Sequence, residues 1–120
     1  MVHFTVSIRC SGLAVLPQIL PFTFGKETNW GDVVMVSCVV QKGDTPLVIE
    51  WLFLSKELVS NSDLFVAHPG DRISTLTISS AQASNAGEYA CKATNPAGSS
   101  NFTAHLKVNG KRRHLLSENN

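Results

Sequence analysis

The side chains best suited to chemistry in this sequence of 120 residues are three cysteines, at positions 10, 38 and 91, and four histidines. The histidines are scattered at 3, 68, 105 and 114, and no Cys-x-x-Cys occurs. The clustered ligand spacing of a zinc site is therefore missing, and we expect no metal and no cofactor. An odd number of cysteines allows one disulfide with a spare thiol, or three free thiols.

Nucleophilic catalysis has little support in the sequence. Gly-x-Ser-x-Gly, His-Glu-x-x-His and glycine-rich phosphate loops do not occur. The side chains of Asp63, His68, Asp71 and Ser74 could lie near one another, but the edge of a sheet offers no closed pocket to tune their reactivity. We predict no catalytic residue and no small-molecule substrate, and we interpret His68 as a surface residue rather than a pH switch.

Composition narrows the class of protein further. The chain is 43% hydrophobic and 16% charged, and ten basic residues against nine acidic ones give a net charge of +1. It is too apolar to be mainly disordered and lacks the basic excess that drives binding to nucleic acid. No apolar run approaches the roughly 18 to 20 residues of a membrane helix. The length fits one globular domain.

Short β-branched and aromatic runs alternate with turn residues throughout the central part of the chain. The pattern predicts strands at 33–40, 47–54, 64–67, 72–79, 88–94 and 101–108, after an opening edge strand that contains Pro17 and Pro21. Pro96 and Gly98 favour a hairpin between the last two strands. So many short strands indicate an all-β fold of two antiparallel sheets packed face to face. We expect a domain at 17–109, a non-domain extension at 1–16 and a disordered tail at 110–120.

Period-two alternation separates the inward side chains from the outward ones. It places Cys38, Trp51, Tyr89 and Cys91 in one layer between the sheets. The predicted core is Val36, Cys38, Val40, Ile49, Trp51, Phe53, Leu76, Ile78, Tyr89, Cys91, Ala93, Ala104, Leu106 and Val108.

The spacing Cys38…Trp51…Leu76-x-Ile78…Gly87-x-Tyr89-x-Cys91-x-Ala93-x-Asn95-x-x-Gly98 resembles immunoglobulin domains of the intermediate (I) set over about residues 17–109. The resemblance implies a Greek-key sandwich, a Cys38–Cys91 disulfide against Trp51, and a tyrosine corner made by the Tyr89 hydroxyl. A buried reduced pair, as in intracellular muscle relatives, stays open. The family usually has Asp at the position of Asn85, whose amide still caps the local turn but cannot pair with a base such as Arg72. We therefore expect slightly lower stability.

Two further segments sharpen the resemblance. Pro17-Gln-Ile-Leu-Pro-Phe-Thr-Phe-Gly25 and Val39-Val-Gln-Lys-Gly-Asp-Thr-Pro-Leu47 look like the variable immunoglobulin domains of the arthropod Down syndrome cell adhesion molecule (Dscam) family. That resemblance implies an extracellular, cell-surface module of a membrane-anchored receptor, encoded by an alternative exon and used for isoform-specific homophilic binding. Segments 1–16 and 111–120 would then be translated non-exonic sequence or a gene-model artefact. The alternatives are an immune-type module that binds foreign ligands and a structural module of an intracellular muscle-type protein.

The predicted binding sites follow from the outward register. Two strands expected to pair present an uncharged face that fits a second copy in an antiparallel, two-fold contact. Its residues are Met35, Ser37, Val39, Gln41, Thr75, Thr77 and Ser79, with Phe65, Val66 and His68 as weaker candidates. Asn101 begins the one Asn-x-Ser/Thr sequon and faces outward, so it is a glycosylation candidate. Cys10 is expected to be unpaired.

Overall fold

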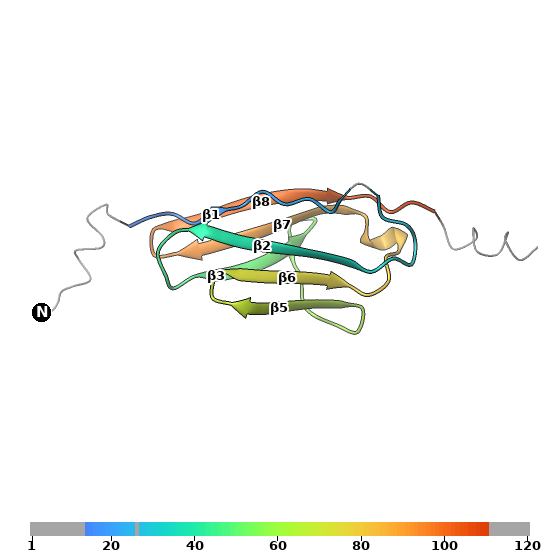
Figure 1. Cartoon of the computed structure of the whole chain (residues 1–120), viewed down its shortest axis with the longest axis horizontal. Coiled ribbons are helices and arrows are strands. Elements are labelled where there is room, and N and C mark those ends of the chain that lie inside the picture. The colour runs from blue at the N-terminus through green and yellow to red at the C-terminus, as the bar shows by residue number, and fades with distance from the viewer. Residues whose placement is uncertain (1–13, 26, 111–120) are drawn as a thin grey trace, which may run out of the picture.

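The computed structural model describes residues 14–25 and 27–110, which form two antiparallel sheets packed face to face (Figure 1). The predicted all-β sandwich is confirmed. One sheet has the strand order β1-β2-β6-β5 and the other β4-β3-β7-β8. The elements are β1 (Gln18–Ile19), β2 (Val34–Lys42), β3 (Val48–Phe53), β4 (Lys56–Glu57), β5 (Leu64–Gly70), β6 (Ile73–Ile78), the 3-10 helix η1 (Ala83–Asn85), β7 (Gly87–Asn95) and β8 (Gly98–Leu106).

The first sheet is built on the pairing of β2 with β6. Both strands alternate between apolar and small polar residues, so one side of the pair enters the core and the other faces outward. The register pairs Val36 with Leu76 and Cys38 with Ser74 on the inward side. Because β2 and β6 are far apart in the sequence, the chain between them must cross to the other sheet and return, as in a Greek key.

The second sheet is dominated by the β7–β8 hairpin, which closes where Asn95 pairs with Gly98. Gly98 has a φ of 143°, as the turn prediction required, and a Cβ there would lie 2.9 Å from Leu16 Cδ2. A side chain at this position would therefore be strained by its backbone and by a close contact.

The opening segment joins both sheets. β1 is an edge strand of only two residues, flanked by prolines whose missing N–H groups cannot extend the ladder. The chain then crosses over, and Trp30 N donates to Asn109 O at 2.7 Å while Asn109 N donates to Thr28 O at 2.7 Å. These two bonds attach the segment before β2 to the end of the second sheet.

The core lies between the sheets and contains the predicted Trp51, Tyr89 and Leu76, each about 1% exposed. Three expected core residues, Phe53, Ala104 and Val108, are only half-buried, so their full burial was wrongly predicted, although Phe53 and Val108 still pack against the core. They lie at the end of β3, on the edge strand β8 and beyond its end, where the opposite sheet covers less of each side chain. Three residues of the buried hydrophobic core were not predicted: Val34, Leu64 and Ala81.

The turn between β3 and β4 differs from the prediction, which extended the strand through Leu54. Leu54 and Ser55 have φ values of 52° and 71°, and Phe53 pairs with Lys56 around them. Two positive φ angles define a type I′ hairpin, a geometry that favours Asn-Gly rather than Leu-Ser. The turn therefore stores backbone strain, because a left-handed conformation costs about 1–2 kcal/mol for an ordinary residue.

Replacing Ser55 by glycine should remove part of this strain. We expect Ser55→Gly to raise the free energy of unfolding by about 0.5–1 kcal/mol, since relief of the left-handed penalty exceeds the entropy that glycine adds to the unfolded chain. Urea unfolding of the full chain measures the change. Ser62→Gly is the matched control, because Ser62 is exposed and its φ is not positive. It should lower stability slightly, and an equal loss at both sites would show that the turn is not strained.

Candidate functional site

A disulfide between Cys38 of β2 and Cys91 of β7 joins the two sheets through the core. The two Cα atoms are 6.4 Å apart, and both residues are fully buried. Of the pairings that the sequence left open, the bridge is the one observed. It closes a loop between residues 53 positions apart, which restricts the unfolded chain and is worth about 4 kcal/mol in the chain-entropy account.

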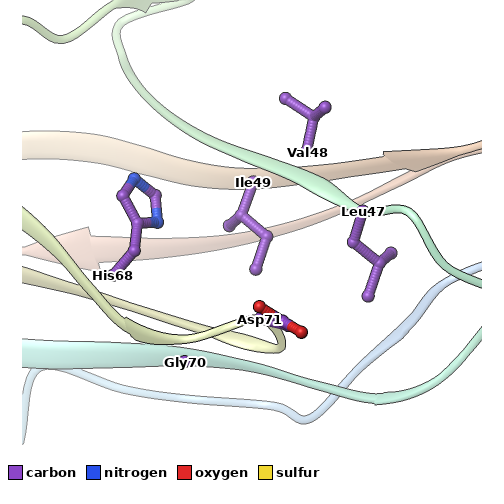
Figure 2. Close-up of a pocket in the computed structure, with 6 residues that line it drawn as sticks. All are labelled: Leu47, Val48, Ile49, His68, Gly70 and Asp71. Carbon is purple, nitrogen blue, oxygen red and sulfur yellow. The ribbon is translucent and has the colours of Figure 1, made fainter.

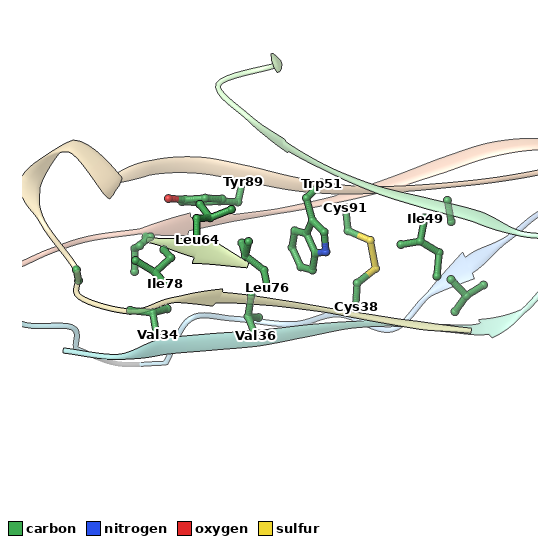
Figure 3. Close-up of a cluster of buried hydrophobic side chains, with 14 residues drawn as sticks. Val34, Val36, Cys38, Ile49, Trp51, Leu64, Leu76, Ile78, Tyr89 and Cys91 are labelled. Carbon is green, nitrogen blue, oxygen red and sulfur yellow. A yellow bond between two sulfur atoms is a disulfide. The ribbon is translucent and has the colours of Figure 1, made fainter. Parts of the chain in front are cut away.

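Trp51 lies beside this disulfide (Figure 3), because it is paired with Cys91 across β3 and β7. Its Nε1–H donates to Ser74 Oγ at 2.9 Å, and Ser74 Oγ donates in turn to Ala67 O at 3.3 Å. A buried indole N–H without a partner would be costly, so Ser74 satisfies it. Ser74 is itself fully buried and is thus unavailable for the nucleophilic role considered from the sequence.

Tyr89 makes a tyrosine corner at one end of the sandwich. Its hydroxyl donates to Asn85 O at 2.6 Å, and Asn85 Oδ1 accepts from Gln82 N at 2.8 Å, so Asn85 caps the turn as expected. Burial raises the pKa of Tyr89 to about 12, and the hydrogen bond to Asn85 opposes that shift more weakly.

The expected cost of having Asn85 in place of an aspartate rested on a partner at Arg72, and this was wrong. Arg72 lies at the opposite end of β6, where its guanidinium donates to Gly43 O at 2.7 Å and to Val40 O at 3.3 Å. An aspartate at position 85 would therefore form no ion pair with Arg72. Having Asn85 there costs the protein no such pair.

The outward side of the β1-β2-β6-β5 sheet carries no charged side chain at the central strand positions that the structure describes. Met35 pairs with Thr77, which pairs with Phe65, so these three side chains form one row across the sheet. Met35 is 66% exposed and Phe65 50% exposed. We name this surface the uncharged face; it comprises Met35, Ser37, Val39, Gln41, Phe65, Ala67, Ile73, Thr75 and Thr77.

The uncharged face gathers most of the predicted interface residues. Ser37 and Thr75 are paired, and their hydroxyl oxygens are 3.2 Å apart in a hydrogen bond. Ser79 lies beyond the end of β6 and donates to Asp63 O at 3.2 Å. Val66 pairs with Leu76 and packs against the core, so its candidacy as an outward contact was wrong: it has the opposite parity to Phe65.

The outward side of the β4-β3-β7-β8 sheet has a different chemistry. Glu50 pairs with Lys92, and Lys92 pairs with Asn101, so charges and the sequon asparagine lie in one row. Asn101 is exposed on the edge strand β8. The two faces of the sandwich thus differ in charge, and the sequon is on the charged one.

A groove runs along the side of the sandwich between β3 and the β5–β6 turn (Figure 2). One cavity of about 340 Å³ is lined by Leu47, Val48, Ile49, His68, Gly70 and Asp71. A second, of about 370 Å³, is lined by Thr45, Pro46, Leu47 and Asp71. The two cavities share Leu47 and Asp71 in their linings, and we call the two together the groove.

The four side chains considered for catalysis are not assembled. His68 and Asp71 line the groove, but Asp63 lies before the far end of β5 and Ser74 is buried beside Trp51. In residues 14–25 and 27–110 no group of three His, Cys, Asp or Glu side chains is placed to hold a metal ion. Within the same ranges, no helix is long and apolar enough to cross a bilayer.

Asn95 ties three segments together, and sequence reasoning treated it only as part of a motif. Its Nδ2 donates to Val15 O at 2.7 Å and to Asp44 O at 3.0 Å, while its Oδ1 accepts from Ala97 N at 2.8 Å and Gly98 N at 3.2 Å. Asn95 is 8% exposed, so its amide is almost fully used inside the protein. Asp44 also binds Val15 through its backbone N–H and its carboxylate, which attaches residues before position 17 to the domain.

Phe22 and Phe24 were also missed as core contacts. The ring of Phe22 lies 5.5 Å from that of Trp51 and 5.0 Å from that of Phe102, and Phe24 lies 5.1 Å from Tyr89. The alternation Phe-Thr-Phe after Pro21 was the available signal, because it places both rings on one side of an extended segment. The predictions for Cys10 and for most of the two end segments lie outside the described residues.

A family model and solved structures of immunoglobulin domains match this chain, and so do curated relatives. The model of the immunoglobulin I-set domain matches residues 17–108. The cell adhesion molecule Dscam1 of Drosophila melanogaster is 43% identical over 104 residues, which is 85% of this chain and 5% of that protein. The crystal structure of the Dscam1 Ig7 domain, isoform 9, is 43% identical, with a TM-score of 0.75 over 78% of this chain and 100% of that one.

A muscle protein also matches. The muscle M-line assembly protein unc-89 of Caenorhabditis elegans is 39% identical over 61 residues, which is 50% of this chain and 1% of that protein. The chain therefore spans only a small fraction of the length of the curated relatives described here.

The tyrosine corner predicts a pH dependence. Below pH 10 the Tyr89 hydroxyl is protonated in both states, and Tyr89→Phe should cost about 1 kcal/mol through the lost hydrogen bond to Asn85. Because the pKa of Tyr89 rises from 10.0 to about 12 on folding, this residue's stabilising contribution is lost as pH rises from about 10 towards 12. The difference between wild type and Tyr89→Phe should shrink over that range. Urea unfolding at pH 8 to 11 measures it, and a constant difference would contradict the assignment.

Proposed function

This chain belongs to the immunoglobulin I-set family, and from that premise we propose that it is an extracellular recognition module of a Dscam-like cell adhesion receptor. It binds a second copy of itself in an isoform-specific, homophilic contact, and the surface used is the uncharged face. The parent protein is anchored in the membrane, and the module acts at the cell surface.

The observation that carries this proposal is the row Met35–Thr77–Phe65 on a sheet face without charges. Burying a charged side chain at an interface costs solvation energy unless it is paired, so a partner can cover this face at low cost. Exposed apolar side chains such as Met35 contribute favourable binding free energy when they are buried. Half-buried hydroxyls such as those of Thr75 and Thr77 can redirect their hydrogen bonds to a partner.

A contact of the uncharged face with its own copy must be two-fold, because the same patch serves both partners. With the two-fold axis perpendicular to the strands, as we propose, the strands of the two copies run antiparallel across the interface. Side chains that differ between isoforms at Met35, Val39 or Phe65 would leave gaps or clashes in mixed pairs, which is how such a surface discriminates. One module binds weakly, and repeated modules on two opposed cells add avidity.

The disulfide supports an extracellular location. Bridges of this kind persist in oxidising compartments and are rare in reducing ones. The exposed sequon at Asn101 agrees with passage through a secretory compartment, and we assign it as a glycosylation site. A glycan there projects from the charged sheet and leaves the uncharged face free.

A second candidate function, a structural module of an intracellular muscle-type protein, is favoured by the match to the muscle M-line assembly protein unc-89. The Cys38–Cys91 bridge argues against it, since a reducing compartment would keep both thiols free. A third candidate function is capture of foreign ligands through the same face. Self-association of the chain would favour homophilic binding over this third function.

Sedimentation equilibrium of the full chain tests the homophilic contact. We expect a reversible dimer, and Met35→Lys or Val39→Glu should weaken it at least tenfold, because each places an unpaired charge in the centre of the contact. Ser99→Lys is the matched control: Ser99 is exposed on the outward side of β8, and its change should leave the dimer intact. A wild type that stays monomeric at millimolar concentration would refute self-recognition by this domain. A dimer insensitive to both changes would move the interface elsewhere.

The glycan assignment has its own test. The chain secreted from a eukaryotic host should carry an N-linked glycan at Asn101, seen as a mass that Asn101→Gln lacks. Because Asn101 and the uncharged face lie on opposite sheets, enzymatic removal of the glycan should not change the dimer constant. An Asn101 that stays unmodified in secreted protein would contradict the assignment, and a dimer that forms only after removal would contradict the chosen face.

A further inference from the structure

We propose that the groove between β3 and the β5–β6 turn binds an extended, basic peptide segment of a partner protein, which adds as a further strand to the free edge of β3. This site is separate from the uncharged face, and the inference does not rest on the homophilic function. It rests on an unpaired strand edge, an apolar groove and the Asp71 carboxylate, which has no lysine or arginine beside it in the groove lining.

The free edge is defined by the hydrogen bonds around β3. Leu58 N donates to Trp51 O at 2.9 Å, so the backbone groups of Trp51 point away from β7. Leu54 N donates to Glu88 O at 3.0 Å, so residues of the other parity point towards β7. Ile49 has the parity of Trp51, and its N–H and C=O therefore face the outer edge.

No described segment covers that edge at Ile49. β4 pairs only with Leu52 and Phe53, and the chain leaves the edge after Leu58. Within the described residues, no hydrogen bond is found for the outward N–H and C=O of Ile49. An exposed row of backbone donors and acceptors is the template on which an extended peptide adds to a sheet.

The groove next to this edge is apolar at its base. Leu47, just before β3, and Ile49 of β3 line it, and Gly70 leaves space on the opposite wall (Figure 2). In a strand added to β3, the residue opposite Ile49 points to the same side as the Ile49 side chain. A long aliphatic stem at that peptide position can lie along Leu47 and Ile49, as the stems of lysine and arginine do on apolar surfaces.

Charge selects a basic peptide. Asp71 lines both cavities of the groove, and its carboxylate makes no hydrogen bond or ion pair within the described residues. The neighbouring Arg72 does not neutralise it, since its guanidinium is bound to Gly43 O and Val40 O. On the other side of the edge, Glu50 faces outward from β3 and lies opposite Lys92 of β7. Asp71 is thus the carboxylate that an added strand meets in the groove, and no lysine or arginine lines the groove.

The probe is an eight-residue peptide that alternates valine and lysine, added to the full 15N-labelled chain. We expect chemical-shift changes centred on the Ile49, His68 and Gly70 amides, with slower hydrogen exchange at Ile49. The peptide with glutamate in place of lysine should not bind. Asp71→Asn should weaken binding about tenfold, because it removes a charge-assisted hydrogen bond.

Asp63→Asn is the matched control, because Asp63 is an exposed carboxylate before the other end of β5 and should not affect the peptide. The proposal is overturned by absence of binding at millimolar peptide, by equal binding of the glutamate peptide, or by an unchanged constant in Asp71→Asn. Shift changes on the uncharged face, at Met35 and Thr77, would also overturn it, and they would assign the peptide to the surface that the homophilic proposal uses.

Discussion

The contact on which the rest of the structure depends is the layer formed by the Cys38–Cys91 bridge and Trp51 between the two sheets. The bridge fixes which side of β2 and of β7 is inward. Because side chains alternate along a strand, it also fixes which side is outward. A slip of β2 by one residue would bury Met35 and expose Cys38. The proposed recognition surface is thus a consequence of the core.

Much of this could be read from the sequence, because period-two alternation and the Cys-Trp-Tyr-Cys spacing are local patterns. They predicted the sheets, the β7–β8 hairpin and the outward positions of β2 and β6. The partner of the Trp51 N–H was not predictable, since a serine among apolar residues gives no sign of what it will face. Asn95 escaped for a related reason: its hydrogen bonds join segments up to 80 residues apart.

The outward faces of the two sheets differ in charge. Glu50 and Lys92 make one outward face favourable in water, whereas Met35 and Phe65 make the other less so. A protein with both faces uncharged would tend to aggregate. A protein with both faces charged would offer no surface that a partner could cover without desolvating charged side chains. The sequon at Asn101 strengthens this asymmetry, because a glycan would shield the face that is already hydrated.

Several strand edges are partly protected from pairing with another chain. β1 is shortened by Pro17 and Pro21, and β8 is covered where Ser100 Oγ donates to Pro17 O. Ser60 Oγ accepts from Val66 N on β5. The stretch of β3 around Ile49 has an edge that no described segment caps, and Asp71 lines the groove beside it. A strand added at this edge would meet the Asp71 carboxylate, so a basic side chain on that strand would be favoured there.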